Sequence, residues 1–126
     1  MSATRCPCLS GLTYDECCGL LHHGVAAAPT AESLMRSRFS AFALGDADYL
    51  LRSWHPSTRP PTLALDDGVH WYRLDIIGSS LGGPGDAKGT VEFRAFYRAA
   101  DGSGSQHEVS RFARDHGRWA YLDAIG

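Results

Sequence analysis

All four cysteines of the chain, Cys6, Cys8, Cys17 and Cys18, lie in one segment of thirteen residues near the N-terminus. The first two are separated by one residue, and the second two are adjacent. Thiolate sulfur is a preferred ligand of zinc, and structural zinc sites use four ligands in a tetrahedron. The spacing therefore predicts one zinc ion held by these four cysteines. Because protein fills all four positions, we expect the ion to be structural, with no open position for catalysis.

Three other uses of clustered cysteines fit this spacing less well. A redox dithiol usually has the spacing C-x-x-C, which the chain lacks. Disulfides are an alternative after oxidation, but a bridge between the adjacent Cys17 and Cys18 would be strained. The common iron–sulfur motifs space their ligands differently. A metal site with four thiolate ligands remains the favoured interpretation.

The length and composition are typical of a single small globular domain with at most a short additional segment. The chain has 126 residues, 44% of them hydrophobic and 21% charged, and a formal net charge of −2. Such a near-neutral chain has no electrostatic footprint for nucleic acid, so we do not expect nucleic-acid binding. A local basic patch of Arg5, His22 and His23 is the exception. No stretch is long enough to span a membrane, and the N-terminus lacks the apolar part of a secretion signal, so we expect a cytoplasmic location.

Three helices are predicted in the first half of the chain. Thr13 and Glu16 have the spacing of a capping box, which predicts a short helix over about 14–21 that carries Cys17 and Cys18. Thr30 is a predicted N-cap for a helix over 31–44, with Gly45 as its stop. Asp46 starts a third helix. Arg36 and Arg38 flank the apolar stripe of the second helix, and we expect them to be solvated or to cap the sheet edge rather than to bind an anion.

The second half of the chain has the pattern of an antiparallel meander. Strands are predicted over 69–81, 90–99, 106–116 and 118–124, with a turn over 101–105 (DGSGS). Helices followed by such strands predict an α+β fold, in which the helices pack on one face of a curved antiparallel sheet. We expect the large aromatic side chains to fill the core rather than line a pocket. These residues are Tyr49, Trp54, Trp71, Tyr97 and Trp119.

The cysteine segment resembles a known zinc motif. Residues 6–19 match CPC-x-SG-x-x-Y-x-x-CCG, which is similar to the SEC-C motif first described at the C-terminus of the SecA translocase ATPase. The match includes the four ligands, Tyr14 and Gly19. Leu9 departs from it, because the motif usually has glycine at that position.

The rest of the chain resembles the bacterial YchJ family, also called UPF0225. The resemblance is carried by residues 34–60, by HEVSRF at 107–112 and by GRWAYLD at 117–123. It implies a SEC-C zinc knuckle over residues 1–24, followed by an NTF2-like domain over residues 25–126, in which helices and a curved sheet form a cone. The family implies no biochemical activity.

The predicted zinc knuckle and the predicted fold lead to two hypotheses about function. The first is a non-enzymatic module whose zinc knuckle contacts a protein partner, because related knuckles take part in protein recognition, including recognition of the SecB chaperone by SecA. The alternative is a small-molecule binder or enzyme that uses the cavity of the cone. No catalytic residue is assigned.

Several polar residues are candidates for such a cavity. His107 and Arg111 share one face of a predicted strand, and Asp123 lies on the next strand. The structural alternative, which we favour, is an Arg111–Asp123 ion pair that ties the last two strands together. His55 and Glu108 are further candidates.

Overall fold

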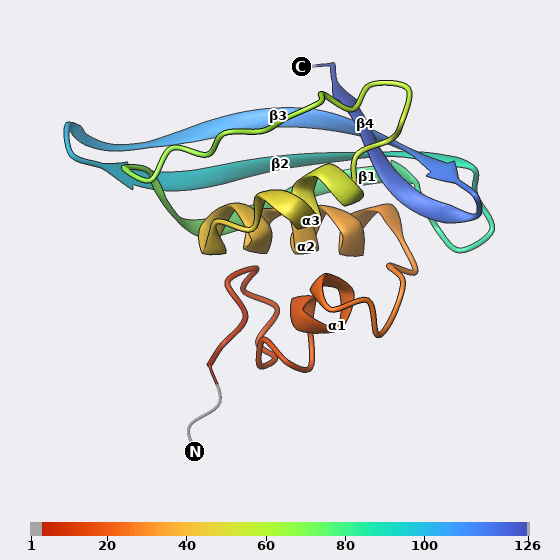
Figure 1. The fold of residues 1–126 in the computed structure, drawn as a ribbon, viewed down its shortest axis with the longest axis horizontal. Coiled ribbons are helices and arrows are strands. Elements are labelled where there is room, and N and C mark those ends of the chain that lie inside the picture. The colour runs from red at the N-terminus through yellow and green to blue at the C-terminus, as the bar shows by residue number, and fades with distance from the viewer. Residues whose placement is uncertain (1–3, 126) are drawn as a thin grey trace.

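The computed structural model describes residues 4–125, in which three helices pack on a four-stranded sheet (Figure 1). Residues 1–3 and 126, the outer ends of the two predicted parts, lie outside the described residues. None of the helices within 4–125 is long and apolar enough to cross a membrane. The elements in chain order are α1 (Cys18–His22), α2 (Ala31–Leu44), α3 (Ala47–Arg52), β1 (His70–Leu81), β2 (Lys88–Ala99), β3 (Gly102–Asp115) and β4 (Arg118–Ala124).

The strands form one antiparallel sheet in the order β1-β2-β3-β4. Helices α2 and α3 lie along one face of this curved sheet, and the segment that contains α1 lies on the far side of α2 (Figure 1). The predicted α+β fold is therefore confirmed. Its three layers are the cysteine segment, the two longer helices and the sheet.

Helix α2 has strong signals at both ends. Thr30 Oγ1 accepts a hydrogen bond from the backbone N–H of Ser33 (3.1 Å), and Ser33 Oγ accepts one from the backbone N–H of Thr30 (3.1 Å). This reciprocal pair satisfies donors that a helix start leaves free. Gly45 ends the helix in the left-handed conformation, with a φ of 75°. The predicted N-cap and stop of this helix are both confirmed.

The main core lies between α2 and the sheet. Burial of a large apolar side chain contributes about 1.5–3 kcal/mol to folding, so this layer is the principal source of stability. Its buried members are Ala31, Leu34, Met35, Phe39, Leu74, Val91, Phe93, Ala95, Phe112 and Trp119. Of the aromatic residues predicted for the core, Tyr49 and Trp119 are buried, whereas Trp54, Trp71 and Tyr97 are only half-buried.

The predicted turn over 101–105 is wrong, because β3 already begins at Gly102. Gly104 pairs with Tyr97 of β2, and a Cβ at Gly104 would lie only 2.8 Å from Tyr97 Oη. The glycine at this position therefore allows the Tyr97 ring to lie over the neighbouring strand. Glycine here serves close packing inside a strand rather than a turn.

Candidate metal centre

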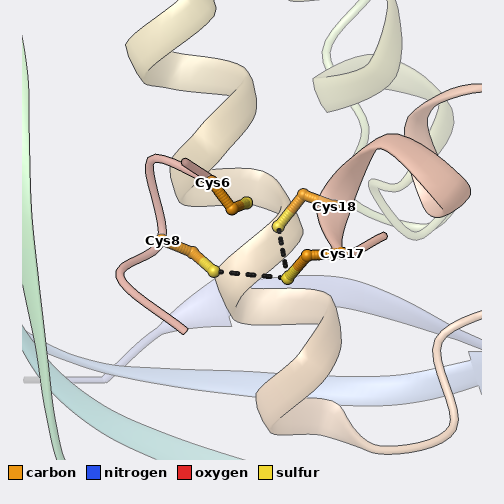
Figure 2. Close-up of side chains that lie close together, drawn as sticks. All are labelled: Cys6, Cys8, Cys17 and Cys18. Atoms are coloured by element: carbon orange, nitrogen blue, oxygen red, sulfur yellow. Dashed lines mark hydrogen bonds between the residues drawn. The ribbon is translucent and has the colours of Figure 1, made fainter. Parts of the chain in front are cut away.

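The sulfur atoms of the four cysteines converge beside α2 (Figure 2). Each of the four ligand atoms lies within 4.8 Å of the other three. Cys17 Sγ is 3.6 Å from Cys8 Sγ and 3.9 Å from Cys18 Sγ. Cys6, Cys8 and Cys18 are buried, Cys17 is half-buried, and none of them forms a disulfide. This cluster of free thiols is compatible with a site for a single metal ion.

Cys6 and Cys8 are positioned by a short pairing of the chain with itself. The backbone N–H of Cys6 donates to the carbonyl oxygen of Leu12 (2.9 Å), and that of Tyr14 donates to Thr4 (2.8 Å). The N–H of Leu9 donates to the carbonyl oxygen of Cys6 (3.1 Å), which closes a tight turn. Leu9 has a φ of 65° in this turn, in the left-handed region that favours glycine.

Cys17 and Cys18 lie at the start of a helix that is shorter than predicted. The expected contact is present, since Thr13 Oγ1 accepts from the N–H of Glu16 (3.3 Å) and donates to Glu16 Oε1 (2.7 Å). The contact between Thr13 and Glu16 begins a turn over residues 14–17, and the α-helix itself begins at Cys18. The predicted helix start at residue 14 is therefore wrong. A continuous helix would separate neighbouring side chains by about 100°. The break at Cys17 instead lets both sulfur atoms face Cys8.

Gly19 fits closely against the turn that precedes α1. A Cβ at this position would lie 2.7 Å from the carbonyl oxygen of Tyr14, a backbone atom that cannot move aside easily. The N–H of Gly19 also donates to this oxygen (2.8 Å). The motif residue Gly19 therefore has a structural reason for its type.

Hydroxyl groups surround the sulfur cluster and support negative charge on it. Ser10 Oγ donates to Cys17 Sγ (3.1 Å), and Ser40 Oγ of α2 lies 3.6 Å from Cys6 Sγ. Hydrogen bonds from Cys18 and then Cys8 lower the pKa of Cys6, whereas the same network raises the pKa of Cys18. Clustered buried thiols cannot all ionise without a cation. Metal binding would therefore displace protons from this cluster.

Buried polar contacts fix the cysteine segment to the helices. His22 Nε2 is 2.7 Å from the carbonyl oxygen of Ser37 in α2, and His22 Nδ1 is 2.6 Å from Tyr14 Oη. Arg36 Nη1 of α2 donates to the carbonyl oxygen of Cys8 (3.0 Å). These contacts hold the segment to the domain in addition to any metal.

These contacts also correct the predicted basic patch. His22 is buried against Tyr49, with ring centroids 4.4 Å apart, and cannot face a nucleic acid. The guanidinium of Arg5 donates to the carbonyl oxygen of Gly11 in its own loop. Only Arg5 and His23 remain exposed.

The second set of predicted residues, His107, Arg111 and Asp123, lies away from the interior of the fold. Arg111 pairs with Asp123 across β3 and β4, with Nε–Oδ1 and Nη2–Oδ2 distances of 2.6 Å and 2.5 Å. His107 Nε2 is 2.6 Å from Glu92 Oε2 instead. All of these side chains are accessible to solvent, on the sheet face that α2 does not cover. They do not converge on a cavity, and Arg111 with Asp123 forms a link between two strands.

A cavity of about 220 Å³ does lie between α2 and the sheet. Its polar wall is formed by Arg38, Gln106, Glu108 and Ser110, while the rest is mostly aromatic. The prediction that Arg38 is solvated is wrong, because this residue is buried. His55 does not line the cavity, since its Nδ1 accepts from the N–H of Ser57 in the loop after α3.

Glu108, one of the candidates predicted for a cavity, does line this one, together with Ser110, which was not predicted. The pattern of strand β3 could have located both. Strand residues alternate between faces, and Phe112 is the largest apolar residue near the end of β3. Phe112 marks the buried face, so Glu108 and Ser110 share it, whereas His107 and Arg111 face outward.

The fold and the cysteine cluster together define an NTF2-like domain preceded by a SEC-C motif. The family model "YchJ, middle NTF2-like domain" matches residues 30–124, and the SEC-C motif model matches residues 4–20. The chain belongs to the UPF0225 family, which confirms the resemblance found in the sequence.

Relatives in this family are similar over almost their full length. A UPF0225 protein of Corynebacterium glutamicum is 56% identical over 117 residues, covering 93% of both chains. One of Streptomyces coelicolor is 53% identical over 123 residues, covering 98% of this chain and 96% of the relative.

Two solved structures share the fold. The solution structure of a SEC-C motif containing protein from Rhodopseudomonas palustris has a TM-score of 0.83 and 36% identity, and covers 98% of both chains. The crystal structure of a SEC-C motif containing protein from Psychrobacter arcticus has a TM-score of 0.77 and 28% identity, and covers 94% of this chain and 80% of that one.

Proposed function

We propose that this protein is a zinc-stabilised interaction module, in which the cysteine segment presents a rigid loop to a protein partner. The metal is zinc and is structural, one ion per chain. The observation that carries the proposal is the exposure of Leu9 and Leu12 on the loop that the cysteines hold. Leu9 is 55% exposed and Leu12 is 49% exposed.

Zinc is supported by the chemistry and spacing of the ligands. With zinc–sulfur bonds of about 2.3 Å, a tetrahedral site places its sulfur atoms about 3.8 Å apart. The distances from Cys17 Sγ to Cys8 Sγ and to Cys18 Sγ, 3.6 Å and 3.9 Å, lie on either side of this value. Four thiolates also leave no position for substrate, so zinc would act by holding the loop in shape.

The loop is a suitable docking element because it is held on both sides. Cys8 precedes Leu9, and Arg36 of α2 donates to the carbonyl oxygen of Cys8. The N–H of Cys6 donates to the carbonyl oxygen of Leu12 itself. Two exposed leucines on a preorganised loop can insert into an apolar pocket at a low entropic cost. The matching partner surface is therefore an apolar pocket on a protein.

The test is an affinity capture from the native cell that compares point variants of the zinc-loaded chain. Leu9→Gly removes the exposed side chain, and the backbone conformation at this position suits glycine. Leu12→Ser removes the second side chain. Leu81→Gly is a matched control, because Leu81 is also exposed (71%) with a positive φ (56°), but lies in the β1–β2 hairpin.

We expect one set of partners to be retained by the wild type and by Leu81→Gly, and lost with Leu9→Gly and Leu12→Ser. Cys17→Ser should lose the same partners through loss of zinc. Undiminished capture by both loop variants would reject this surface. Capture that survives Cys17→Ser would reject the role of the metal.

A further inference from the structure

Arg38 brings a positive charge to the cavity between α2 and the sheet. The residue is only 3% exposed and forms part of the wall of this cavity. Its Nη1 donates to the carbonyl oxygen of Leu50 (2.7 Å) and to Ser53 Oγ (2.6 Å). Within residues 4–125, its Nε and Nη2 groups have no acceptor, and the guanidinium has no ion-pair partner. Two donor groups thus remain available to a bound molecule.

Two aromatic rings fix the orientation of this guanidinium. Its central carbon lies 4.5 Å from the ring centroid of Tyr121 and 5.2 Å from that of Trp54, and both residues line the cavity. Burial lowers the pKa of Arg38 to about 10, which still leaves the group charged at neutral pH. Glu108 attracts this charge and raises the pKa of Arg38, but the two form no ion pair, and a buried charge without an ion pair opposes folding. An anion bound in the cavity would provide the ion pair that the guanidinium of Arg38 lacks.

Glu108 is the acidic residue of the cavity wall, but its carboxylate is already hydrogen-bonded. Gln106 Nε2 donates to Glu108 Oε1 (3.0 Å), and Ser110 Oγ donates to Glu108 Oε2 (2.9 Å). Neither of these hydrogen bonds involves Arg38. In the cavity wall, both carboxylate oxygens of Glu108 therefore have hydrogen-bond donors, whereas Nε and Nη2 of Arg38 have no acceptor within the described residues.

The rest of the wall indicates the shape of the ligand. Phe42, Trp71 and Phe93 add an apolar, aromatic surface to the wall of the cavity. A cavity of about 220 Å³ has the liquid volume of about seven water molecules, which is the size range of a single-ring acid. We propose that the cavity binds a small monocarboxylate with a flat apolar body, whose carboxylate oxygens accept hydrogen bonds from Nε and Nη2 of Arg38.

The charges of the wall favour a monoanion over a dianion. A phosphate monoester carries nearly two negative charges at neutral pH, and its sites usually supply several donors. Here one guanidinium provides the donors, and Glu108 on the same wall would repel the second charge. An organic cation is disfavoured because Arg38 is unpaired and both oxygens of Glu108 have donors.

The test is a titration of the ¹⁵N-labelled, metal-loaded full chain with benzoate, followed by NMR. Benzamide, benzylamine and phenyl phosphate serve as neutral, cationic and dianionic controls of similar size. We expect saturable shifts of the indole N–H signals of Trp54 and Trp71, and at least tenfold tighter binding of benzoate than of each control. Equal binding of benzamide, tighter binding of either charged control, or shifts confined to other residues would overturn the proposal.

Variants locate the site. Arg38→Met keeps an unbranched apolar side chain in place of the arginine stem but removes the charge and the donors, so benzoate affinity should fall about tenfold or more. Arg111→Met removes a guanidinium from the outer face of the sheet and should leave the affinity unchanged. Ala95→Leu narrows the cavity without touching Arg38, and should also weaken binding.

Thermal melting establishes that each variant is folded. If Arg38→Met does not fold, Ala95→Leu decides the question. Wild-type affinity in folded Ala95→Leu, or in folded Arg38→Met, would show that benzoate binds elsewhere and would overturn the proposal. Neither result bears on the loop of Leu9 and Leu12, which lies on the far side of α2.

Discussion

His22 of the cysteine segment and Ser37 of α2 are joined by a buried hydrogen bond, with His22 Nε2 2.7 Å from the carbonyl oxygen of Ser37. The other ring nitrogen of His22 is 2.6 Å from Tyr14 Oη, so one side chain links the turn before α1 to the central helix. This link makes the cysteine segment part of the folded domain. The metal centre therefore rests on a fixed platform.

His22→Phe should destabilise the protein by about 1–3 kcal/mol, because it keeps the ring volume but leaves buried polar groups without partners. Urea unfolding measures the change in the free energy of unfolding. His23→Phe is the matched control, since His23 is exposed, and it should change stability by less than about 0.5 kcal/mol. Equal effects of the two substitutions would show that the buried link contributes nothing.

Removal of the metal should loosen the cysteine segment while the sheet remains folded. The main core between α2 and the strands contains none of the four cysteines. With a strong chelator, or in Cys18→Ser, we expect NMR shifts to change in residues 4–24 and on the adjacent face of α2. The melting temperature should fall by more than about 5 °C.

Metal analysis provides the control for this experiment. About one zinc per chain is expected in the wild type purified under reducing conditions, and none in Cys18→Ser. Ser10→Ala removes the hydrogen bond to Cys17 Sγ and the one accepted from the N–H of Leu12, but no ligand, and should keep the full zinc content. A wild-type chain that melts at the same temperature with and without zinc would argue against a structural metal.

The sequence predicted local structure correctly where the residue types at a position favour one structural role. Four close cysteines predicted a single cluster, and Thr30 with Gly45 predicted the ends of α2, because caps depend on local backbone geometry. Arg38 shows where such reasoning fails. An arginine beside an apolar stripe is normally solvated, and its burial depends on Leu50, Ser53 and two aromatic rings, all distant in sequence.

Dependence on residues that are distant in sequence also limits what can be predicted about the polar residues of β3. Their spacing alone predicts which of them share a face, whereas the face that α2 covers follows only when the apolar Phe112 is taken as the marker of the buried face. That choice depends on the packing of the whole sheet, which buried Phe112 and therefore turned Glu108 inward and Arg111 outward. The break at Cys17 is a further example, because the geometry of the sulfur cluster overrides a local helix signal.

Leu9→Gly should stabilise the protein by about 0.5–1 kcal/mol. A left-handed conformation costs a residue with a side chain about 1–2 kcal/mol, and the greater entropy of glycine in the unfolded chain offsets part of this gain. Little burial is lost, because more than half of Leu9 is exposed. Urea unfolding of the zinc-loaded chain measures the effect.

Leu12→Gly is the control for this stabilisation. Leu12 is exposed to a similar extent, but it is not among the residues with a positive φ. Glycine should therefore destabilise the chain at this position, since it adds entropy to the unfolded state without relieving strain. A gain in stability at both positions would show that the backbone conformation of Leu9 is not the cause.

The Arg111–Asp123 ion pair predicts an acid-dependent component of stability. Arg111 donates to the carboxylate and lowers the pKa of Asp123 in the folded state below its unfolded value of about 3.9. The stabilisation is therefore present above the unfolded pKa and is lost as the pH falls through the lower, folded pKa. Asp123→Asn and Arg111→Met should each flatten the decline in the urea midpoint between about pH 4 and pH 2 relative to the wild type, and the double variant should flatten it no further. An unchanged acid decline in both single variants would show that this exposed pair is not coupled to folding.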